Sequence, residues 1–294
     1  EASPLPSYIF DRETLRILDV NRRMSEQYGY TREELLAMTI RDIRPADQIP
    51  LLQANLEKAM HNKGVIHFGV MIHHHKDGTR KQVDINGKRI RLQDRDCIMV
   101  QAHDITDRVI KGNLDQLERN VIEMTLRSKT DIAVILSEYL VGLEALISGL
   151  MASILRVSDG RVYNWASPSL PAFYADALNG LTIGPAEGSC GTAAYTGKQV
   201  IVSSIEKSSL WKKYAELAKA AGLSACWSTP ILNPQGKVIA TFANYYSDVR
   251  TPSAIELEIF NRAAVLISIL IESYEKEQNL RISYERFEHV TKAT

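Results

Sequence analysis

Cysteine is scarce in this chain, whose 294 residues include three: Cys97, Cys190 and Cys226. An odd number of widely spaced cysteines argues against a disulfide framework and fits a reducing compartment. The chain also lacks an uninterrupted apolar run of about 18 residues, the length that a membrane-spanning helix needs. No signal peptide is visible, and Glu1 is not an initiator methionine, so we expect further sequence upstream. We therefore expect a cytoplasmic location and no membrane span.

An excess of either charge is missing as well, because 35 Lys and Arg side chains balance 35 Asp and Glu side chains. No global field then favours nucleic acid or an anionic membrane, and neither is predicted as a partner. The apolar fraction is 45%, which is ordinary for a folded globular protein. A chain of this length is expected to form about two domains.

The first 108 residues alternate between strand and short-helix patterns. Thr31 and Glu34 have the spacing of a capping box, which predicts the start of a helix. Turns rich in Asp, Gly and Gln separate three later segments with strand character. These predicted strands cover residues 65–74, 80–91 and 96–104. We expect two strands, then helices, then three antiparallel strands.

This order of elements resembles a PAS domain. The matching stretches are LRILDVN, YGYTREELLAMTIRDIRP, HHHKDGT and the closing DITDR. The resemblance implies a sheet flanked by helices and a sensory role. Asp104 and Thr106, in the closing motif, are expected to cap the helix that follows. The resemblance also implies that they pass movement of the sheet into that helix.

PAS domains can hold haem or flavin, but the residues for either are missing here. A haem needs an axial histidine, usually on the long helix beside the pocket, and residues 45–60 contain none. The Asn-Cys-Arg motif of a photoactive flavin domain is absent, and Cys97 fits an apolar core strand. His73 and His75 would share one face of a strand, with no acidic or cysteine ligand to complete a metal site. We predict no cofactor and no metal.

Two apolar stripes have the spacing of a coiled-coil seam. The first consists of Ile110, Leu114, Leu117, Val121 and Met124. The second consists of Ile259, Ala263, Leu266 and Leu270. Such stripes are typical of helices that pair with a partner, so we expect a parallel homodimer. Two or three heptads also fit a helix packed on its own domain, and that alternative stays open.

The run from Gly180 to Pro252 is the most informative part of the chain. The small residues Gly188–Ala194 predict a tight turn that opens an apolar strand. A helix is expected over 210–221, followed by strands over 229–232 and 238–246. LPAFYADALNGLTIGP, GSCGTAAYTGK, ACWSTPI and the pairing of Arg250 with Pro252 resemble the second half of a GAF domain. The subtype is one found behind a PAS domain in bacterial sensor proteins.

The GAF resemblance implies a cavity for an unidentified small molecule, mostly apolar with a few polar groups. The candidate lining residues are Ser189, Cys190, Thr192, Trp227, Ser228 and Tyr245. No nucleophile, base and orienting group occur together, so no catalytic residue is predicted. One enzyme branch of the family, the free methionine sulfoxide reductases, carries a Gly-x-Cys-Gly turn like Gly188–Gly191. Its chemistry needs a low-pKa thiolate and resolving cysteines, and a further cysteine between Cys190 and Cys226 is absent.

The chain is therefore predicted to be α+β, with two domains that each contain a central antiparallel sheet flanked by helices. The expected divisions are a PAS domain over 1–108, a signalling helix over 109–130, a GAF domain over 131–275 and an exit helix over 276–294 that leads into a further, truncated PAS domain. By resemblance, the parent is a two-component sensor histidine kinase whose output domain follows Thr294 in the same chain. The alternatives are a diguanylate cyclase or phosphodiesterase output and, as a minor one, a GAF-based redox enzyme such as a methionine sulfoxide reductase.

Overall fold

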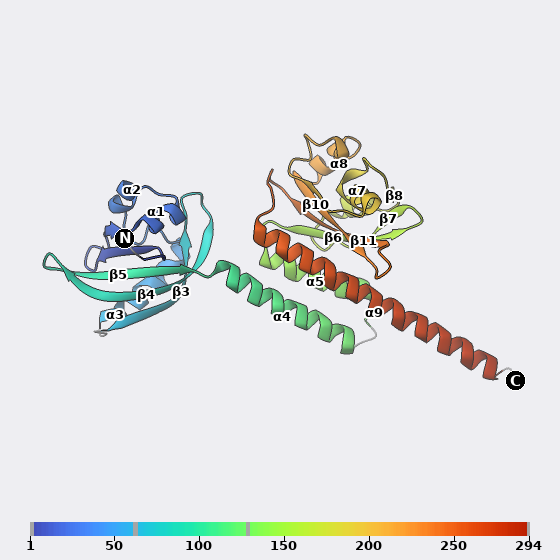
Figure 1. The fold of residues 1–294 in the computed structure, drawn as a ribbon, viewed down its shortest axis with the longest axis horizontal. Helices are drawn as coiled ribbons and strands as arrows, with labels where there is room; N and C mark the ends of the chain where they lie inside the picture. Colours follow the sequence, from blue (N-terminus) through green and yellow to red (C-terminus); the bar gives the residue numbers. More distant parts are fainter. Residues whose placement is uncertain (1–2, 61–63, 128–129, 293–294) are drawn as a thin grey trace. The chain divides into compact units, whose positions relative to one another are not determined.

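The computed structural model describes residues 3–60, 64–127 and 130–292 of the chain. The chain divides into two compact units, Glu1–Gly112 and Asn113–Thr294, and each contains one antiparallel sheet (Figure 1). The predicted α+β class, with two antiparallel sheets flanked by helices, is confirmed. Within the described ranges, no helix is both long and apolar enough to cross a membrane.

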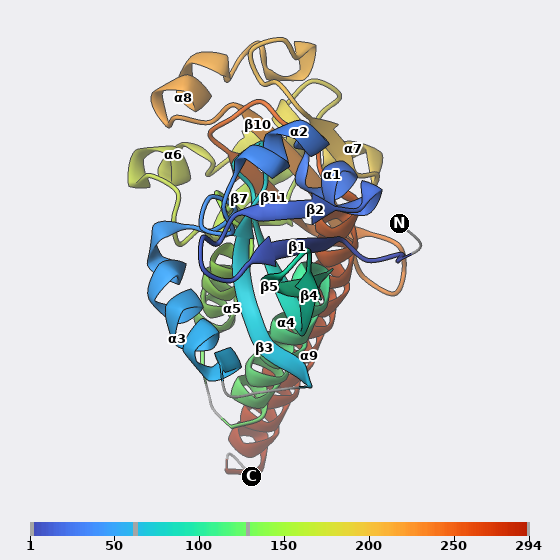
Figure 2. The same ribbon diagram turned by 90° about the vertical axis from the view of Figure 1, so that its left-hand side faces the viewer.

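Unit 1 is built on a five-stranded sheet in the order β2-β1-β5-β4-β3. Its strands are β1 (Ser7–Asp11), β2 (Ile17–Val20), β3 (Val65–His74), β4 (Arg80–Leu92) and β5 (Arg95–Asp104). Its helices are α1 (Arg22–Tyr28), α2 (Arg32–Ala37), the short 3-10 helix η1 (Ala46–Gln48) and α3 (Ile49–Met60). Figure 2 shows α1 and α2 beside β1 and β2. The last three strands begin and end within one residue of the ranges expected from the sequence.

Side chains at the helix starts fix where α1 and α2 begin. Asn21 Oδ1 accepts from the Met24 amide at 3.0 Å and from the Ser7 amide at 2.9 Å, so one side chain caps α1 and ties it to β1. At α2, Thr31 Oγ1 accepts from the Glu34 amide at 3.2 Å, and Glu34 Oε2 accepts from the Thr31 amide at 2.9 Å. The predicted capping box is therefore confirmed.

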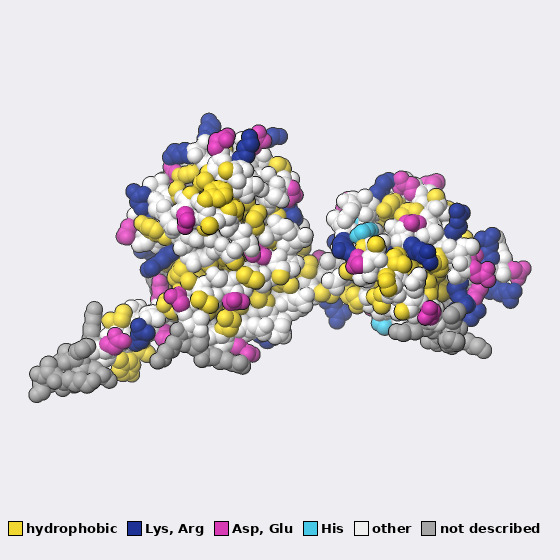
Figure 3. Space-filling view, turned by 180° about the vertical axis from the view of Figure 1, so that it is seen from behind, with side chains coloured by type: hydrophobic (Ala, Val, Ile, Leu, Met, Phe, Trp, Pro, Cys, Tyr) yellow, Lys and Arg dark blue, Asp and Glu magenta, His cyan; other side chains and the backbone are white. Residues whose placement is uncertain are grey.

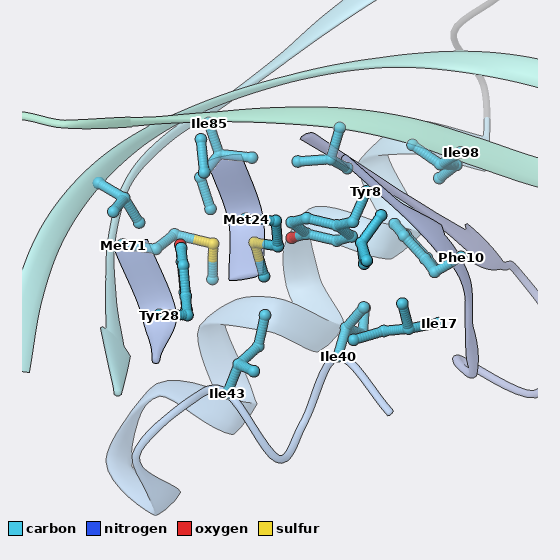
Figure 4. Packing of buried hydrophobic residues seen from close by; sticks show 14 of the residues in the cluster. Tyr8, Phe10, Ile17, Met24, Tyr28, Ile40, Ile43, Met71, Ile85 and Ile98 are labelled. Carbon is cyan, nitrogen blue, oxygen red and sulfur yellow. The ribbon is translucent and has the colours of Figure 1, made fainter. Parts of the chain in front are cut away.

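Apolar side chains from the sheet and the helices of unit 1 meet in one buried core (Figure 4). Tyr8 and Phe10 enter it from β1, and Met24 and Tyr28 enter it from α1. All four are at most 2% exposed, and burial of an apolar side chain contributes roughly 1.5–3 kcal/mol. The hydroxyls of both tyrosines lie in these apolar surroundings, so each needs a hydrogen-bond partner inside the core.

Unit 2 is built on a six-stranded sheet in the order β8-β7-β6-β11-β10-β9. Its strands are β6 (Met151–Ser158), β7 (Arg161–Ala166), β8 (Leu181–Thr182), β9 (Val200–Val202), β10 (Ala225–Leu232) and β11 (Val238–Tyr246). Its helices are α4 (Thr106–Arg127, whose first residues belong to unit 1), α5 (Ile132–Leu146), α6 (Ala172–Ala177), α7 (Gly188–Thr196), η2 (Ser209–Trp211), α8 (Ala215–Ala220) and α9 (Ala254–Lys292). In Figure 1, α5 and α9 cover one face of the sheet and α7 lies on the other.

Both apolar stripes that the sequence assigned to a dimer seam turn inward. On α9, each member of the stripe is at most 7% exposed: Ile259, Ala263, Leu266 and Leu270. On α4, Leu114 and Val121 are 1% exposed, whereas Ile110, Leu117 and Met124 are half-buried. Packing within a single chain therefore accounts for the buried members, and their assignment to a seam is corrected. For the half-buried Ile110, Leu117 and Met124 the assignment stays a prediction. A second copy has no access to the buried ones unless the helices first leave their domain.

Two segments of unit 2 differ from the expectation. The small residues from Gly188 to Ala194 form most of helix α7, not a tight turn. Their lack of bulk serves close packing, because a Cβ at Gly191 would lie 2.9 Å from the Thr182 carbonyl oxygen. The helix expected over 210–221 is divided into η2 and α8. The chain turns between them, where two side chains are held: Trp211 donates to Ser189 of α7, and Tyr214 donates to Glu187, the residue before α7.

Candidate functional site

The candidate site is a cavity inside unit 2, not a surface patch. On the faces shown in Figure 3, basic and acidic side chains are interspersed rather than gathered by sign. The cavity lies between the sheet, α7 and the η2–α8 segment, and its lining includes Tyr174, Ser189, Cys190, Trp211 and Tyr245. Its volume is about 20 Å³, enough for a single water molecule and far below the size of a metabolite pocket. In this structure the cavity therefore has no room for a small-molecule ligand.

Strand alternation decides which predicted residues face the cavity. Cys226 pairs with Tyr245 across β10 and β11, and both side chains point to the cavity face. Trp227 pairs with Asn244 and points to the opposite face. The Trp227 ring lies 6.0 Å from that of Phe260 on α9, between ring centroids. The assignment of Trp227 to the ligand pocket is therefore corrected: it joins the sheet to α9.

The other predicted pocket residues divide into two groups. Ser189, Cys190 and Tyr245 line the cavity. Ser228 and Thr192 are buried but do not line it, and their hydroxyls have no hydrogen-bond partner within the part of the chain that the structure describes. The first group therefore comes together at the cavity, and the second lies outside its lining.

Ser189 links three elements around the cavity. Its hydroxyl donates to the Cys226 carbonyl oxygen at 3.1 Å, which joins α7 to β10. The same oxygen accepts from the Trp211 indole nitrogen at 3.0 Å, which joins α7 to η2. Because Trp211 is 3% exposed, this second bond holds a large apolar side chain over the cavity.

Cys190 lines the cavity and Cys226 lies in the same buried core, a meeting that the sequence alone did not indicate. Cys190 Sγ lies 3.7 Å from the Tyr245 hydroxyl. Hydrogen bonding from the Cys226 thiol, offset by burial and helped by Tyr245, lowers the pKa of Cys190 below that of a free thiol. Burial, and then its contact with Cys190, raises the pKa of Cys226. Cys190 is therefore the thiol of this pair that ionises first.

Alkylation of the Cys97→Ser variant, which keeps only this pair, tests the assignment. We expect the rate at Cys190 to rise with pH with a midpoint below the ordinary thiol value of about 8.5, because the thiolate is the reacting form. In the Cys226→Ala background the largest cause of the shift is gone, so the midpoint moves to higher pH. Mass spectrometry after iodoacetamide, over a pH series, gives both midpoints. Identical midpoints in the two backgrounds would contradict the assignment.

An acidic side chain is bonded to the segment that lies over the cavity. We call this segment, residues 208–221 with η2 and α8, the cover. The Glu187 carboxylate, just before α7, accepts from the Lys213 ammonium and from the Tyr214 hydroxyl. Lys213 first and Tyr214 second lower the pKa of Glu187, so the carboxylate is charged at neutral pH. Sequence reasoning missed all three residues. Their separation along the chain leaves no local pattern that would have found them.

The two predicted cap residues lie together at the start of α4. Asp104 Oδ1 accepts from the Thr106 amide at 2.9 Å, as a capping side chain does. Thr106 Oγ1 accepts from the Gln82 amide at 2.9 Å, which ties the first residue of α4 to β4. The sheet and the helix are therefore joined by hydrogen bonds at this point. Their role in signalling stays a prediction.

Two family models match the chain in succession. The model of the PAS fold matches residues 1–110, and the model of the GAF domain matches residues 129–272. The chain is a tandem PAS–GAF sensory region. Unit 1 contains the PAS domain and unit 2 contains the GAF domain.

A curated relative and two solved structures are similar to this PAS–GAF region. The "methyl sulfide methyltransferase-associated sensor" of Methanosarcina acetivorans is 33% identical over 188 residues, which are 63% of this chain and 18% of the relative. The GAF domain from a phosphoenolpyruvate-protein phosphotransferase of Coxiella burnetii has a TM-score of 0.48 at 16% identity, covering 57% of this chain and 97% of that one. The chromophore-binding domain of a bacteriophytochrome from R. palustris has a TM-score of 0.44 at 12% identity, covering 93% and 95%. The chain thus spans under a fifth of its curated relative.

Proposed function

We propose that this PAS–GAF region is the input part of a longer cytoplasmic sensor, of the two-component histidine kinase class, and works as a parallel homodimer. A small molecule enters the GAF cavity, shifts β10 and β11, and thereby moves α9. The observation that carries this proposal is that β10 and β11 have one face toward the cavity and the other toward α9. Tyr245 lines the cavity and its cross-strand partner Cys226 lies on the same face of the sheet, while their neighbours Trp227 and Tyr246 contact the helix side.

The contacts between the strands and α9 support direct transmission. Trp227 packs on Phe260, and the Ser268 hydroxyl donates to the Leu232 carbonyl oxygen at 2.7 Å. At the start of α9, the Tyr246 hydroxyl donates to Glu256 at 3.1 Å. These contacts lie at the start and along the first half of a single 39-residue helix. A small shift of the sheet would therefore move the rest of α9 as a rod.

Contacts among the helices support a route that also involves α4. Arg262 of α9 donates to Asp115 of α4 at 2.6 Å and, through Nε, to Glu118 at 3.0 Å. Leu117 of α4 packs on Gly142 of α5, where a Cβ would lie 2.3 Å from it. α4 thus packs against both α5 and α9, the two helices that lie on the sheet. Movement of α9 would change the packing of the helix that leads back to the PAS domain.

The class of the parent protein rests on family resemblance. The relative from Methanosarcina acetivorans is named a sensor and is several times longer than this chain, which supports an output part elsewhere in the parent. Incubation of the full-length parent with γ-labelled ATP tests the kinase class. Acid-labile, alkali-stable phosphate on the protein is expected, whereas conversion of GTP to cyclic di-GMP would replace the kinase by a cyclase.

Removal of the cover's anchor is expected to open the cavity. In the Glu187→Gln variant the amide keeps the shape of the carboxylate but loses the charge that holds Lys213. We expect amide hydrogen exchange over residues 208–221 to increase about tenfold or more, since the segment opens locally. Exchange–mass spectrometry gives this rate, with Glu216→Gln, an exposed change on α8, as the matched control. Equal protection in all three proteins would remove Glu187 as the anchor.

Redox chemistry in the same cavity is a second candidate, favoured by the meeting of Cys190 and Cys226. An oxidant such as hydrogen peroxide would take two electrons and two protons from the pair, which leaves a disulfide and water. The alkylation series described above also tests this function. A Cys190 midpoint near the ordinary value of a free thiol, about 8.5, would argue for a packing role instead.

A further inference from the structure

Another cavity of unit 2 lies at the cover, between α8 and the end of β11. Its volume is about 320 Å³, at the lower end of the range for small-molecule sites. Three segments form its walls: the loop Ser204–Glu206, the helix α8 with residues 222–224 after it, and the chain after β11, where Ser247 and Val249 lie. We call this cavity the outer groove.

The cover borders both cavities, because its helix has two different faces. Tyr214 and Leu217 line the GAF cavity, whereas Ala215 and Lys219 line the outer groove. At 3.6 residues per turn, positions 215 and 219 share one side of α8, and positions 214 and 217 lie on the other. A molecule in the outer groove would therefore contact the cover from the side opposite the GAF cavity.

The floor of the outer groove is apolar and is fixed by backbone hydrogen bonds. Ile205 is 2% exposed and Leu223 is 4% exposed. The Ile205 amide donates to the Ser224 carbonyl oxygen at 2.8 Å, and the Ser224 amide donates to the Tyr246 carbonyl oxygen at 2.8 Å. The loop is thus joined to the residue before β10 and to the end of β11. A preformed floor lowers the cost of binding an aliphatic side chain.

Two walls of the outer groove have exposed groups of opposite charge. Glu206 lies in the loop and Lys219 lies on α8, and neither has an ion-pair or hydrogen-bond partner among the described residues. A further carboxylate, Glu216, lies three residues before Lys219 on the same helix. Three hydroxyls that also lack a partner within the described ranges line the groove: Ser204, Ser224 and Ser247. A molecule with one ammonium group and one carboxylate would complement this rim.

We infer that the outer groove binds a free α-amino acid with an aliphatic side chain. The ammonium group of the ligand contacts Glu206, its carboxylate accepts from Lys219 and from the serine hydroxyls, and its side chain lies on Ile205 and Leu223. The cavity volume suits a single amino acid rather than a longer peptide. This site is separate from the GAF cavity and goes beyond the proposed function, since it needs no ligand in that cavity.

The position of the outer groove gives such a ligand a route to α9. Val249 lines the groove and precedes Arg250, whose amide donates to the Ser203 carbonyl oxygen at 3.2 Å. The Arg250 guanidinium donates to Glu256, in the first turn of α9, at 2.7 Å. A bound amino acid therefore ties the cover to the segment that holds the start of α9.

Calorimetric titration of the whole chain with leucine tests this inference. Two analogues each lack one charge: leucinamide has no carboxylate, and N-acetylleucine has no ammonium group. We expect leucine to bind at least about threefold more tightly than either analogue, which is within the range for an exposed ion pair. Amide hydrogen exchange should slow over residues 215–224 when leucine is added, while the PAS domain stays unchanged.

Two exposed substitutions assign the charges. Lys219→Met should lose the preference for leucine over leucinamide, and Glu206→Gln should lose the preference for leucine over N-acetylleucine. Lys212→Met, an exposed change in the cover but outside the lining of the groove, should bind leucine as the wild type does. Because all three side chains are exposed, the variants are expected to fold.

Three results would overturn the inference. The first is a wild-type chain that does not bind leucine, or that binds it no more tightly than both analogues. The second is a Lys219→Met variant that keeps the wild-type preference for leucine. The third is slower exchange in α7 alone, because leucine would then bind in the GAF cavity. None of these results bears on the Glu187→Gln test, so the proposed function is tested separately.

Discussion

Replacement of Trp227 by alanine is expected to lower the unfolding free energy of the GAF domain by about 3–5 kcal/mol. The side chain is 1% exposed, and its ring lies 4.6 Å from that of Tyr246 and 6.0 Å from that of Phe260, between centroids. It fills the space between β10 and α9, where no other side chain can replace its volume without repacking. The cavity left behind adds to the lost burial.

Hydrogen exchange of β10 and α9 in increasing urea gives this loss, because a two-domain chain does not unfold in one step. The PAS domain serves as the internal control and should keep its own transition. Tyr195→Ala is the matched aromatic control, since Tyr195 on α7 is 61% exposed and its loss should change stability by under about 0.5 kcal/mol. A loss below about 1 kcal/mol in Trp227→Ala would mean that α9 is not held to the sheet through this side chain.

Local patterns were sufficient for the strands of the PAS domain. β3, β4 and β5 follow one another with short polar turns, and their side chains alternate. The ends of these strands could therefore be predicted from the local sequence. The capping box of Thr31 and Glu34 was readable for the same reason, since both partners lie three residues apart.

Features that depend on packing between distant segments could not be predicted from the sequence. The glycines at 188 and 191 suggested a turn, whereas Gly191 is needed because the Thr182 carbonyl oxygen lies against it. Trp227 was placed in the pocket through the GAF resemblance, but the face that it occupies follows from strand alternation. Heptad spacing on α4 and α9 shows which side of a helix is buried and does not say against what.

Almost all contacts at the site join residues that are far apart in the sequence. Glu187 with Lys213, and Cys190 with Cys226, come from elements far apart in the chain. Propensity and periodicity describe one element at a time. The cavity was therefore predicted from the resemblance to a family, and the contacts between its residues became visible only in the structure.

Two glycine-to-alanine changes in helices are expected to have opposite signs. Gly191→Ala in α7 places a Cβ 2.7 Å from the Glu187 Cβ and 2.9 Å from the Thr182 carbonyl oxygen, and the backbone oxygen cannot move without shifting β8. We expect a loss of about 1–3 kcal/mol for the GAF domain, despite the higher helix propensity of alanine. Displacement of Glu187 should also open the cover, as in Glu187→Gln.

The matched change is Gly112→Ala in α4, where a Cβ meets nothing within 4 Å. Alanine there should stabilise the helix by about 1 kcal/mol, because only propensity acts. Hydrogen exchange of α4 and of α7, measured on both variants under the same conditions, separates the two effects. If Gly191→Ala proved as stable as Gly112→Ala, α7 would not be pressed against β8, and the small residues that first suggested a turn would need another reason.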